Sequence, residues 1–451
     1  MIRLIIIATM SLMALTGCKE ERVTIIPPGS TPTQQATVFT TKKVNGVWKL
    51  YKGDNEFYIN GAATNNFYGD VKDWGGNVVR TYGTNEATKA ILDEAWSKGL
   101  YVNLGLAMKD CEDFSYTNAA NAATIAEQFE NHRKWVRNYR NHPAVLCWSI
   151  GNEAEGGTAE VNKTYFKEVE KIAAMIHEED PKHPTTITFA NADVDKRIKV
   201  LMQNAPSIDI LSINMYYPNV GNVAKNVASA GWDKPWMITE YGPRGTWALS
   251  TTTDPKTLSW GKLEEMTSTE KADIYEKIWR NDIKANESKG CIGSFIFLWG
   301  YQTHGDVLSW YGLFDKSHNT FGGVDKISEC WTGVPVAKPA PRIENRSKMT
   351  LNGKTSNASV TLTAGSTDNV AKVEATSPTG ETLKYRWFII KDERLANGNA
   401  MPDGIAGLIP DPSKSEITFK APSAGYYRLY VFVTDEVNHK VAMSCIPFQA
   451  K

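Results

Sequence analysis

The feature that most constrains the fold is a repeated alternation between short apolar runs and amphipathic segments. The amphipathic segments between the runs have helical spacing at 86–98, 123–139, 159–178 and 268–289. Eight runs rich in Val, Ile, Leu and Phe lie at residues 57–61, 77–82, 101–108, 145–150, 185–189, 208–216, 236–239 and 293–299. Continuous apolar runs of this length are typical of strands covered on both faces. Eight strand-helix units favour a closed (β/α)8 barrel over an open sheet, which would carry a Gly-rich phosphate turn that this chain lacks.

The chain of 451 residues has room for a barrel of roughly 250 residues and a second domain. Runs at 44–51 and 57–61 alternate around Asn-Gly and Gly-Asp turns and predict a hairpin that leads into the first strand, giving a barrel domain over 43–334. Beyond a linker marked by Pro335, Pro339 and Pro341, strand patterns without helices occur at 359–363, 383–390, 416–420 and 426–434. Residues 335–451 therefore predict a β-sandwich that resembles immunoglobulin-like or PKD-like modules.

The N-terminus has the pattern of an export signal over residues 1–17, with Arg3 before an apolar stretch. The tetrad Leu15-Thr16-Gly17-Cys18 resembles the lipobox of bacterial lipoproteins, which implies that Cys18 is lipidated. Lys19-Glu20-Glu21 is similar to an export tag, so an outer-membrane, cell-surface location is expected. A Pro/Ser/Thr/Gln-rich stretch within 18–42 predicts a flexible tether. The alternative is an ordinary secretory signal with a chance cysteine.

The 50 basic and 50 acidic residues cancel. A neutral chain has no overall field that attracts nucleic acid or a polyanion, so we expect a neutral polysaccharide as ligand, a membrane contact only through the lipid anchor, and a monomer. The five cysteines other than Cys18 lack metal-ligand spacing, and neither a metal nor another cofactor is expected. Buried free thiols are favoured over a disulfide between Cys291 and Cys330.

Two glutamates end strands that lie across the barrel mouth from each other. Gly151-Asn152-Glu153 ends the fourth strand, and Thr239-Glu240-Tyr241-Gly242 ends the seventh. Catalytic groups of such barrels project from the carboxyl ends of strands. Hydrolysis of a glycoside requires one carboxyl group to protonate the leaving oxygen and a second to attack or stabilise the anomeric carbon. The pair therefore predicts a glycoside hydrolase.

Both motifs resemble the signatures of glycoside hydrolase clan A, which includes the family 2 barrel. The resemblance implies a retaining mechanism, with Glu153 as acid/base and Glu240 as nucleophile. It also implies roles for four further residues. Arg80 corresponds to an arginine that keeps the nucleophile ionised, and Asn152 to an asparagine that contacts the sugar 2-hydroxyl. Tyr216 corresponds to a tyrosine beside the nucleophile, and Trp299 to a tryptophan that forms the floor of the cleaving subsite. Three loop residues after strands seven and eight are candidates for outer subsites: Trp247, His304 and Trp310.

Finer similarity points to the family 158 group within the clan. It is carried by 75–83, 92–95, 151–156 and 298–300 followed by 310–312, and it implies endo-acting cleavage of β-1,3-glucan of the laminarin type. Tyr82 departs from this pattern, since a tryptophan is expected there. Alternatives are the same mechanism on mannan, β-1,4-glucan or a galactoside, transglycosylation, and a non-catalytic surface lipoprotein that binds glycan.

Overall fold

The computed structural model describes residues 35–64, 67–190, 193–245, 258, 260–261, 264–301, 310–392 and 403–451. Residues 35–451 form one compact unit. The predicted signal, the lipidation site Cys18 and most of the tether lie outside the described residues. Within the described part of the chain, no helix is long and apolar enough to cross a membrane.

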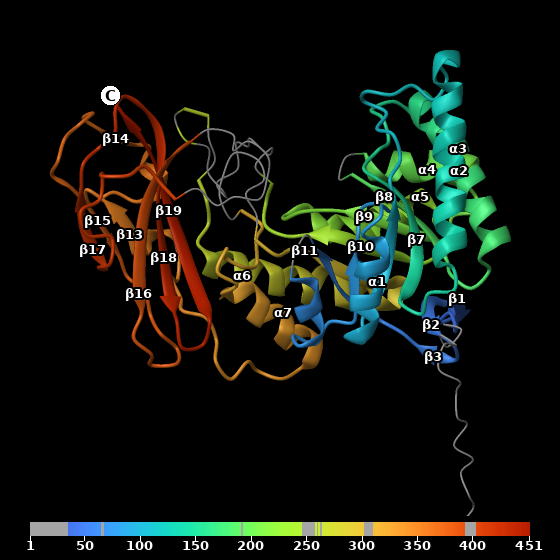
Figure 1. The fold of residues 1–451 in the computed structure, drawn as a ribbon, viewed down its shortest axis with the longest axis horizontal. Helices are drawn as coiled ribbons and strands as arrows, with labels where there is room; N and C mark the ends of the chain where they lie inside the picture. The colour runs from blue at the N-terminus through green and yellow to red at the C-terminus, as the bar shows by residue number, and fades with distance from the viewer. Residues whose placement is uncertain are drawn as a thin grey trace, which may run out of the picture. The chain divides into compact units, whose positions relative to one another are not determined.

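Eight parallel strands close into a barrel, as the alternating pattern predicts (Figure 1). Neighbouring strands follow one another in chain order, and β11 pairs with β4 to close the ring. Nearly all of their residues are buried, which explains why they read as continuous apolar runs. The strands are β4 (Ile59–Thr64), β5 (Val78–Arg80), β6 (Tyr101–Leu106), β7 (Val145–Asn152), β8 (Thr185–Phe189), β9 (Ile210–Asn214), β10 (Trp236–Tyr241) and β11 (Cys291–Trp299).

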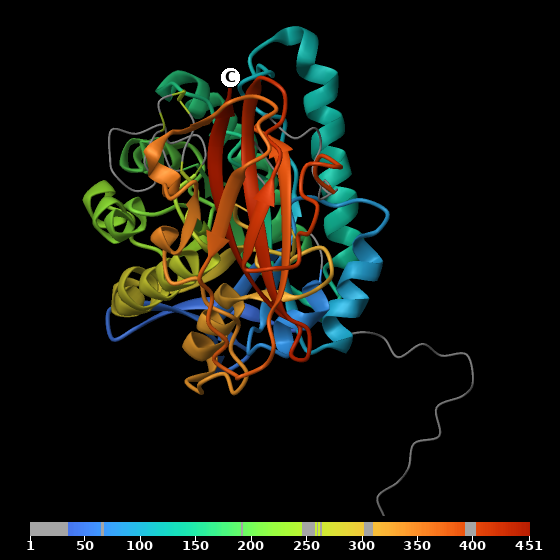
Figure 2. The same cartoon turned by 90° about the vertical axis from the view of Figure 1, so that its left-hand side faces the viewer.

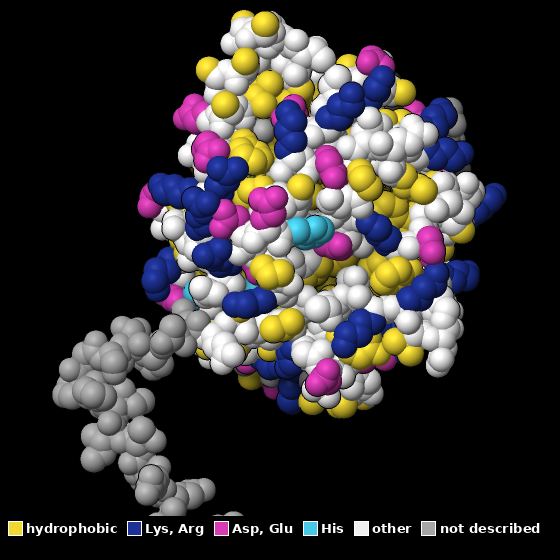
Figure 3. Space-filling model, turned by 90° about the vertical axis from the view of Figure 1, so that its right-hand side faces the viewer, with side chains coloured by type: hydrophobic (Ala, Val, Ile, Leu, Met, Phe, Trp, Pro, Cys, Tyr) yellow, Lys and Arg dark blue, Asp and Glu magenta, His cyan; other side chains and the backbone are white. Residues whose placement is uncertain are grey.

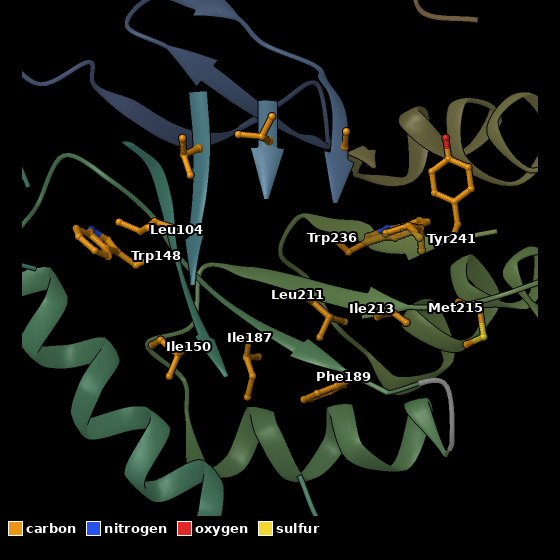
Figure 4. Close-up of a cluster of buried hydrophobic side chains, with 14 of the residues drawn as sticks. Leu104, Trp148, Ile150, Ile187, Phe189, Leu211, Ile213, Met215, Trp236 and Tyr241 are labelled. Atoms are coloured by element: carbon orange, nitrogen blue, oxygen red, sulfur yellow. The ribbon is translucent and has the colours of Figure 1, made fainter. Parts of the chain in front are cut away.

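Helices cover the outer face of the barrel and bury an apolar layer against it. Figure 4 shows strand side chains of this layer, among them Leu104, Ile187 and Leu211. The predicted helix over 268–289 divides into α6 (Ser268–Lys277), a π-helical turn (Ile278–Ile283) and a 3-10 turn (Lys284–Lys289). The other helices are α1 (Thr88–Ser97), α2 (Ala122–Tyr139), α3 (Ala159–Glu179), α4 (Val194–Asn204), α5 (Val223–Ala230) and α7 (Gly322–Thr332).

The N-terminal hairpin occurs with its turns at the predicted Asn-Gly and Gly-Asp pairs. Strands β1 (Phe39–Val44) and β2 (Val47–Lys52) pair antiparallel, and β3 (Asn55–Glu56) adds to β2. The first turn falls at Asn45 and Gly46, both with positive φ, as a two-residue hairpin turn requires. The hairpin therefore precedes the barrel, and the run at 57–61 belongs to β4 and its approach.

The C-terminal region forms two further sheets, whose strands are seen in Figure 2. Side chains of both sheets share one hydrophobic cluster, which includes Trp387, Ile417 and Leu429. The immunoglobulin-like assignment remains a prediction. One sheet contains β12 (Thr320–Phe321), β14 (Val360–Leu362), β16 (Lys384–Lys391), β18 (Gly425–Asp435) and β19 (Lys440–Ala450); the other contains β13 (Met349–Leu351), β15 (Asn369–Val373) and β17 (Glu416–Phe419).

The five cysteines among the described residues are free thiols. Cys291 in β11 and Cys330 in α7 are both buried and unpaired. The expectation of buried free thiols is met for these two residues, and the alternative disulfide does not form in this structure.

Candidate active site

The side chains with catalytic potential gather at the carboxyl ends of the barrel strands. Arg80 is the last residue of β5, Glu153 directly follows β7, Asn214 is the last residue of β9, and Glu240 is the penultimate residue of β10. Their strands neighbour or face one another in the closed ring. This is the face on which (β/α)8 enzymes place their chemistry.

The chain turns sharply where it delivers Glu153. Gly151 has a φ of 74°, and Glu153 has a φ of 51°, in the left-handed region that residues other than glycine rarely adopt. A side chain at Gly151 would collide with the Tyr165 hydroxyl. The Glu153 amide donates to the Thr188 carbonyl at 3.0 Å, which anchors the turn to β8. Strained non-glycine residues of this kind concentrate at functional sites.

Glu240 lies buried in a cradle of three donors. The Arg80 guanidinium donates through Nη1 to Oε1 of Glu240 at 2.9 Å, and the Tyr82 hydroxyl donates to the same oxygen at 2.9 Å. The Tyr216 hydroxyl donates to Oε2 at 2.5 Å. Burial raises the pKa of each tyrosine well above its usual range, and the negative charge of Glu240 adds to this effect. Both tyrosines therefore remain protonated donors. The cradle binds an anionic carboxylate and fixes its orientation.

Arg80 connects Glu240 on β10 with Asn152 at the end of β7. Its side chain is 1% exposed. Nη1 also reaches the Thr239 carbonyl at 3.2 Å, and Nη2 donates to Oδ1 of Asn152 at 2.5 Å and to the Thr188 hydroxyl at 3.2 Å. One buried cation thus contacts side chains or backbone of strands β7, β8 and β10. Such a charge stabilises nearby anions strongly because solvent screens it little.

Glu153 has a different environment from Glu240. It accepts one side-chain hydrogen bond, from Nδ2 of Asn214 at 2.8 Å. Burial, reinforced by the negative charge of Glu240, raises the pKa of Glu153 to about 7, against the opposing effects of Asn214 and Arg80. Two carboxyl groups with environments this different suit an acid and a nucleophile, since one holds a proton near neutral pH and the other accepts hydrogen bonds from a guanidinium and two hydroxyls.

Some of the predicted site residues lie together in one hydrogen-bond network, and others do not. Arg80, Asn152, Glu153, Tyr216 and Glu240 belong to one hydrogen-bond network. Trp247 and His304 lie outside the described residues.

Two predicted aromatic residues are buried in this structure. Trp299 is 0% exposed, and its Nε1 donates to the Phe67 carbonyl at 2.9 Å. Trp310 is 2% exposed, and its Nε1 donates to the Arg244 carbonyl at 2.6 Å. Neither presents a face for a sugar in this structure. On β11 the half-buried aromatic residue is Phe297, whose ring lies 5.9 Å from that of Tyr216.

Several residues of the network escaped the sequence analysis. Asn214 and Thr188 come from strand-terminal positions like those of the glutamates, but their uncharged side chains did not single them out. Tyr82 appeared only as a departure from the expected pattern, yet it bonds the nucleophile candidate. Arg244, four residues after Glu240, is 9% exposed, and its buried Nε has no hydrogen-bond partner among the described residues. No cluster of metal-ligating side chains occurs among the residues that the structure describes.

A closed (β/α)8 barrel with carboxyl groups at the carboxyl ends of its fourth and seventh strands carries the two groups that glycoside hydrolysis uses. Residues 86–266, which contain both Glu153 and Glu240, match the family described as "Glycosyl hydrolases family 2, TIM barrel domain". This segment of the chain is therefore similar to the TIM barrel domain of that family.

Two curated relatives match shorter stretches. A β-glucuronidase from Paenibacillus borealis is 27% identical over 152 residues, covering 31% of this chain and 24% of that protein. A β-glucuronidase from Felis catus is 31% identical over 104 residues, covering 23% of this chain and 14% of that protein. The chain thus covers about a quarter or less of the length of these relatives.

Among solved structures, β-glucuronidase 2 of Bacteroides uniformis has a TM-score of 0.48 at 12% identity, covering 92% of this chain and 48% of that one. An endo-β-1,4-mannanase from Thermotoga petrophila has a TM-score of 0.40 at 13% identity, covering 88% and 99% respectively.

Proposed function

We propose that this protein is a retaining glycoside hydrolase that cleaves a β-linked glycan through Glu240 and Glu153. The observation that carries the proposal is the contrast between the two carboxyl groups, one held by three donors and the other with a pKa of about 7. A family 2 type barrel over residues 86–266 supports the same reaction class.

The mechanism follows from this contrast. An oxygen of Glu240 attacks the anomeric carbon while the bond to the leaving oxygen breaks, and Glu153 donates its proton to that oxygen. Glu153 then removes a proton from water, which attacks the same carbon and releases Glu240 with retained configuration. When the charge of Glu240 is consumed in the covalent intermediate, the pKa of Glu153 falls, which suits its change from acid to base.

Asn152 supports recognition of the sugar next to the nucleophile. Its Oδ1 accepts from Arg80 at 2.5 Å and from Asn214 at 3.1 Å, which fixes the orientation of the amide. No hydrogen bond of its Nδ2 to the described residues is found, so this nitrogen remains as a donor for a sugar hydroxyl. Hydrogen bonds of this kind that strengthen in the transition state contribute to glycoside hydrolysis.

For the substrate we propose β-1,3-glucan, cleaved by endo action. The resemblance of segments such as 75–83 and 151–156 to the family 158 group supports this specificity. The net charge of zero is compatible with a neutral polymer, and in Figure 3 basic and acidic side chains are interspersed on the face that it shows. We expect no metal and no other cofactor.

A β-linked uronide is a second candidate. Arg244 follows the strand of Glu240, is 9% exposed and has a guanidinium without a carboxylate partner among the described residues. A buried guanidinium of this kind suits bidentate recognition of a carboxylate. Both curated relatives are named β-glucuronidases.

The test is product release from laminarin, mixed-linkage glucan, cellulose, mannan, galactan and an aryl β-glucuronide. We expect short oligosaccharides from laminarin, abolished in Glu240→Ala and Glu153→Ala but retained in Glu130→Ala, an exposed glutamate on α2. Cleavage of another substrate would overturn the specificity alone. Glycan binding without hydrolysis, unchanged in all variants, would replace the enzyme proposal with a binding protein.

We also propose that the mature chain is an outer-membrane lipoprotein anchored through Cys18. An anchored hydrolase at the cell surface suits a polymer too large to be imported. Incorporation of labelled palmitate is expected in the wild type and lost in Cys18→Ala, which should be released in soluble form. Labelling that persists in the variant would contradict the proposal.

A further inference from the structure

A groove outside the catalytic cradle lies between helix α2 and the loops that follow β5 and β6. It has a volume of about 570 Å³, within the roughly 300–1,000 Å³ range of small-ligand sites. Three segments form it: the loop after β5 with Thr84, the end of β6 with Met108, and one face of α2. The mechanism proposed for Glu153 and Glu240 uses none of these side chains.

The inner end of the groove adjoins the catalytic residues through two short connections. Thr84 lies two residues after Tyr82, whose hydroxyl donates a hydrogen bond to Glu240 at 2.9 Å. Met108 packs against Gly151, since a Cβ placed on this glycine would lie 3.2 Å from Cγ of Met108. Gly151 precedes Glu153 by two residues. The loops that line the groove are thus joined directly to segments that carry the catalytic side chains.

The side chains of α2 that face the groove repeat at helical spacing. Thr124, Glu127, Asn131 and Trp135 succeed one another at intervals of three or four residues, which places them on one face of the helix, and Gln128 lies next to Glu127. Gln128 accepts from the Lys109 amide at 2.9 Å and so ties the helix to the end of β6. The groove wall is thus a supported surface and not an isolated loop.

The chemistry of the wall suits a neutral sugar. Two carboxylates, Glu86 and Glu127, are balanced by two ammonium groups, Lys109 and Lys134, so the groove has no net charge that selects an anion. Hydroxyl, amide and carboxylate groups line the same groove as Trp135, which is half-buried, stacks on Tyr139 and has the Lys134 ammonium 5.3 Å from its ring centre. The exposed part of this ring offers apolar surface to a sugar, and the neighbouring polar groups offer hydrogen bonds to its hydroxyls.

A buried polar group in the wall is poorly satisfied by the described residues. His132 is 5% exposed and lines the groove, and neither ring nitrogen has a well-formed hydrogen bond, the Ala107 carbonyl offering only a weak backbone contact. Burial lowers the pKa of His132 to about 4, so the ring is neutral and carries one donor and one acceptor. Buried polar groups normally find a partner, and here a sugar hydroxyl or a water in the groove would supply it.

We propose that this groove is an outer subsite that binds a neutral sugar residue of an oligosaccharide whose bond is cleaved at Glu240. The inference rests on the proposed function and deepens it, because a subsite beyond the cleaved bond makes the enzyme prefer chains over single glycosides. Trp135 and Asn131 are the side chains that determine this preference.

The test compares Trp135→Ala and Asn131→Ala with Trp96→Ala, which removes an exposed tryptophan from α1, away from the groove. Hydrolysis is measured on gluco-oligosaccharides of two to six β-1,3-linked units, on the corresponding β-1,4-linked glucose and mannose series, and on aryl β-monoglycosides. The ratio of kcat/KM for the longest cleaved oligosaccharide to that for the aryl glycoside should fall about fivefold to tenfold in the groove variants and stay constant in Trp96→Ala. Thermal unfolding confirms that each variant folds.

Binding of the same oligosaccharides to Glu240→Gln separates the two proposals. If no substrate is hydrolysed but Trp135→Ala in this background weakens oligosaccharide binding, the groove is supported and the proposed enzyme function fails. If oligosaccharides are hydrolysed with the same length preference in all variants, the enzyme function is supported and the groove proposal is overturned. Absence of any length preference or oligosaccharide binding in the wild type also overturns the groove.

Discussion

At the scale of single residues, the site depends on how one carboxylate is held. Glu240 accepts from a guanidinium and two tyrosine hydroxyls, so its position is determined from three directions. Oε1 has two of the donors and Oε2 has one. Oε2 accepts fewer of these hydrogen bonds and is therefore freer to attack. Removal of the Tyr216 hydroxyl takes away the donor that holds this oxygen in place. The two tyrosines therefore have unequal importance.

Removal of the Tyr216 hydroxyl should be the more damaging of the two changes. Tyr216→Phe is expected to lower kcat/KM by roughly tenfold to a hundredfold, because a hydrogen bond to a charged group contributes about 1.5–3 kcal/mol. Tyr82→Phe should cost less, since Arg80 still binds the same oxygen. Tyr385→Phe in β16 is the control and should not change activity. Steady-state kinetics on one substrate give the order; a larger loss in Tyr82→Phe would contradict this account of the cradle.

The pKa of Glu153 determines the alkaline limb of activity. The active form needs Glu153 protonated, so kcat/KM should be level on the acid side of about pH 7 and fall tenfold per unit above it. Glu153→Gln cannot lose a proton. With an aryl glycoside whose leaving group needs no protonation, this variant should lack the alkaline limb altogether. A limb near pH 7 that persists in Glu153→Gln would show that another group titrates.

At the scale of the elements, the turn after β7 determines where Glu153 lies. Gly151 combines a positive φ with close packing against Tyr165 and Met108. Gly151→Ala should destabilise the protein by about 1–3 kcal/mol and reduce activity, since both the strain and the collision displace the turn. Gly157→Ala is the matched control, because nothing lies within 4 Å of its added carbon. Denaturant unfolding and kcat measured on the two variants check this, and equal behaviour would contradict it.

Elements whose residues follow one continuous hydropathy pattern could be predicted from the sequence. The eight barrel strands are apolar throughout because both faces are covered, and few other structures produce short, continuous apolar runs of this kind. The segment over 268–289 keeps a helical pattern while its hydrogen bonding changes to π and 3-10 types, which apolar spacing does not distinguish. Strand β19 contains Pro447, a residue that ordinarily argues against a strand, and it escaped prediction.

Aromatic residues were the least predictable part of the site. Trp299 fits both a sugar platform and a barrel core, and the structure buries it completely between Phe314 and Trp331. The glutamates were predictable for a physical reason, since a carboxylate at a strand end in the barrel mouth has little structural purpose. Asn214 and Thr188 lie at equivalent ends but carry no charge, so their residue types alone do not point to chemistry.

At the scale of the whole molecule, residues 35–451 form one compact unit in which barrel and C-terminal sheets share buried polar contacts. The Tyr430 hydroxyl of β18 donates to Glu265 at 2.8 Å, and the Met443 amide of β19 donates to the Ser268 hydroxyl at 2.9 Å. Lys440 at the start of β19 pairs with Asp325 of α7, both nearly fully buried. The C-terminal sheets are therefore built onto the barrel by contacts that are costly to disrupt.

The buried pair gives the whole-molecule prediction. Asp325→Ala leaves the Lys440 ammonium buried without its counter-ion and should destabilise the protein by about 3–5 kcal/mol. The double variant Asp325→Leu with Lys440→Met should recover most of the loss. Glu374→Ala, which breaks an exposed pair with Lys348, should have no measurable effect. The free energy of unfolding of all three variants is measured in urea by fluorescence. An Asp325→Ala variant as stable as the wild type would refute the prediction.

The central claim is that Glu240 forms a covalent bond to the sugar. The most direct test incubates the enzyme with the 2-deoxy-2-fluoro glycosyl fluoride of whichever sugar the substrate panel identifies, followed by peptide mass spectrometry. The account predicts one adduct per chain on the peptide that contains Glu240, with loss of activity in step and no adduct in Glu240→Gln. An adduct on another residue, or hydrolysis with inverted configuration and no adduct, would contradict the proposed mechanism.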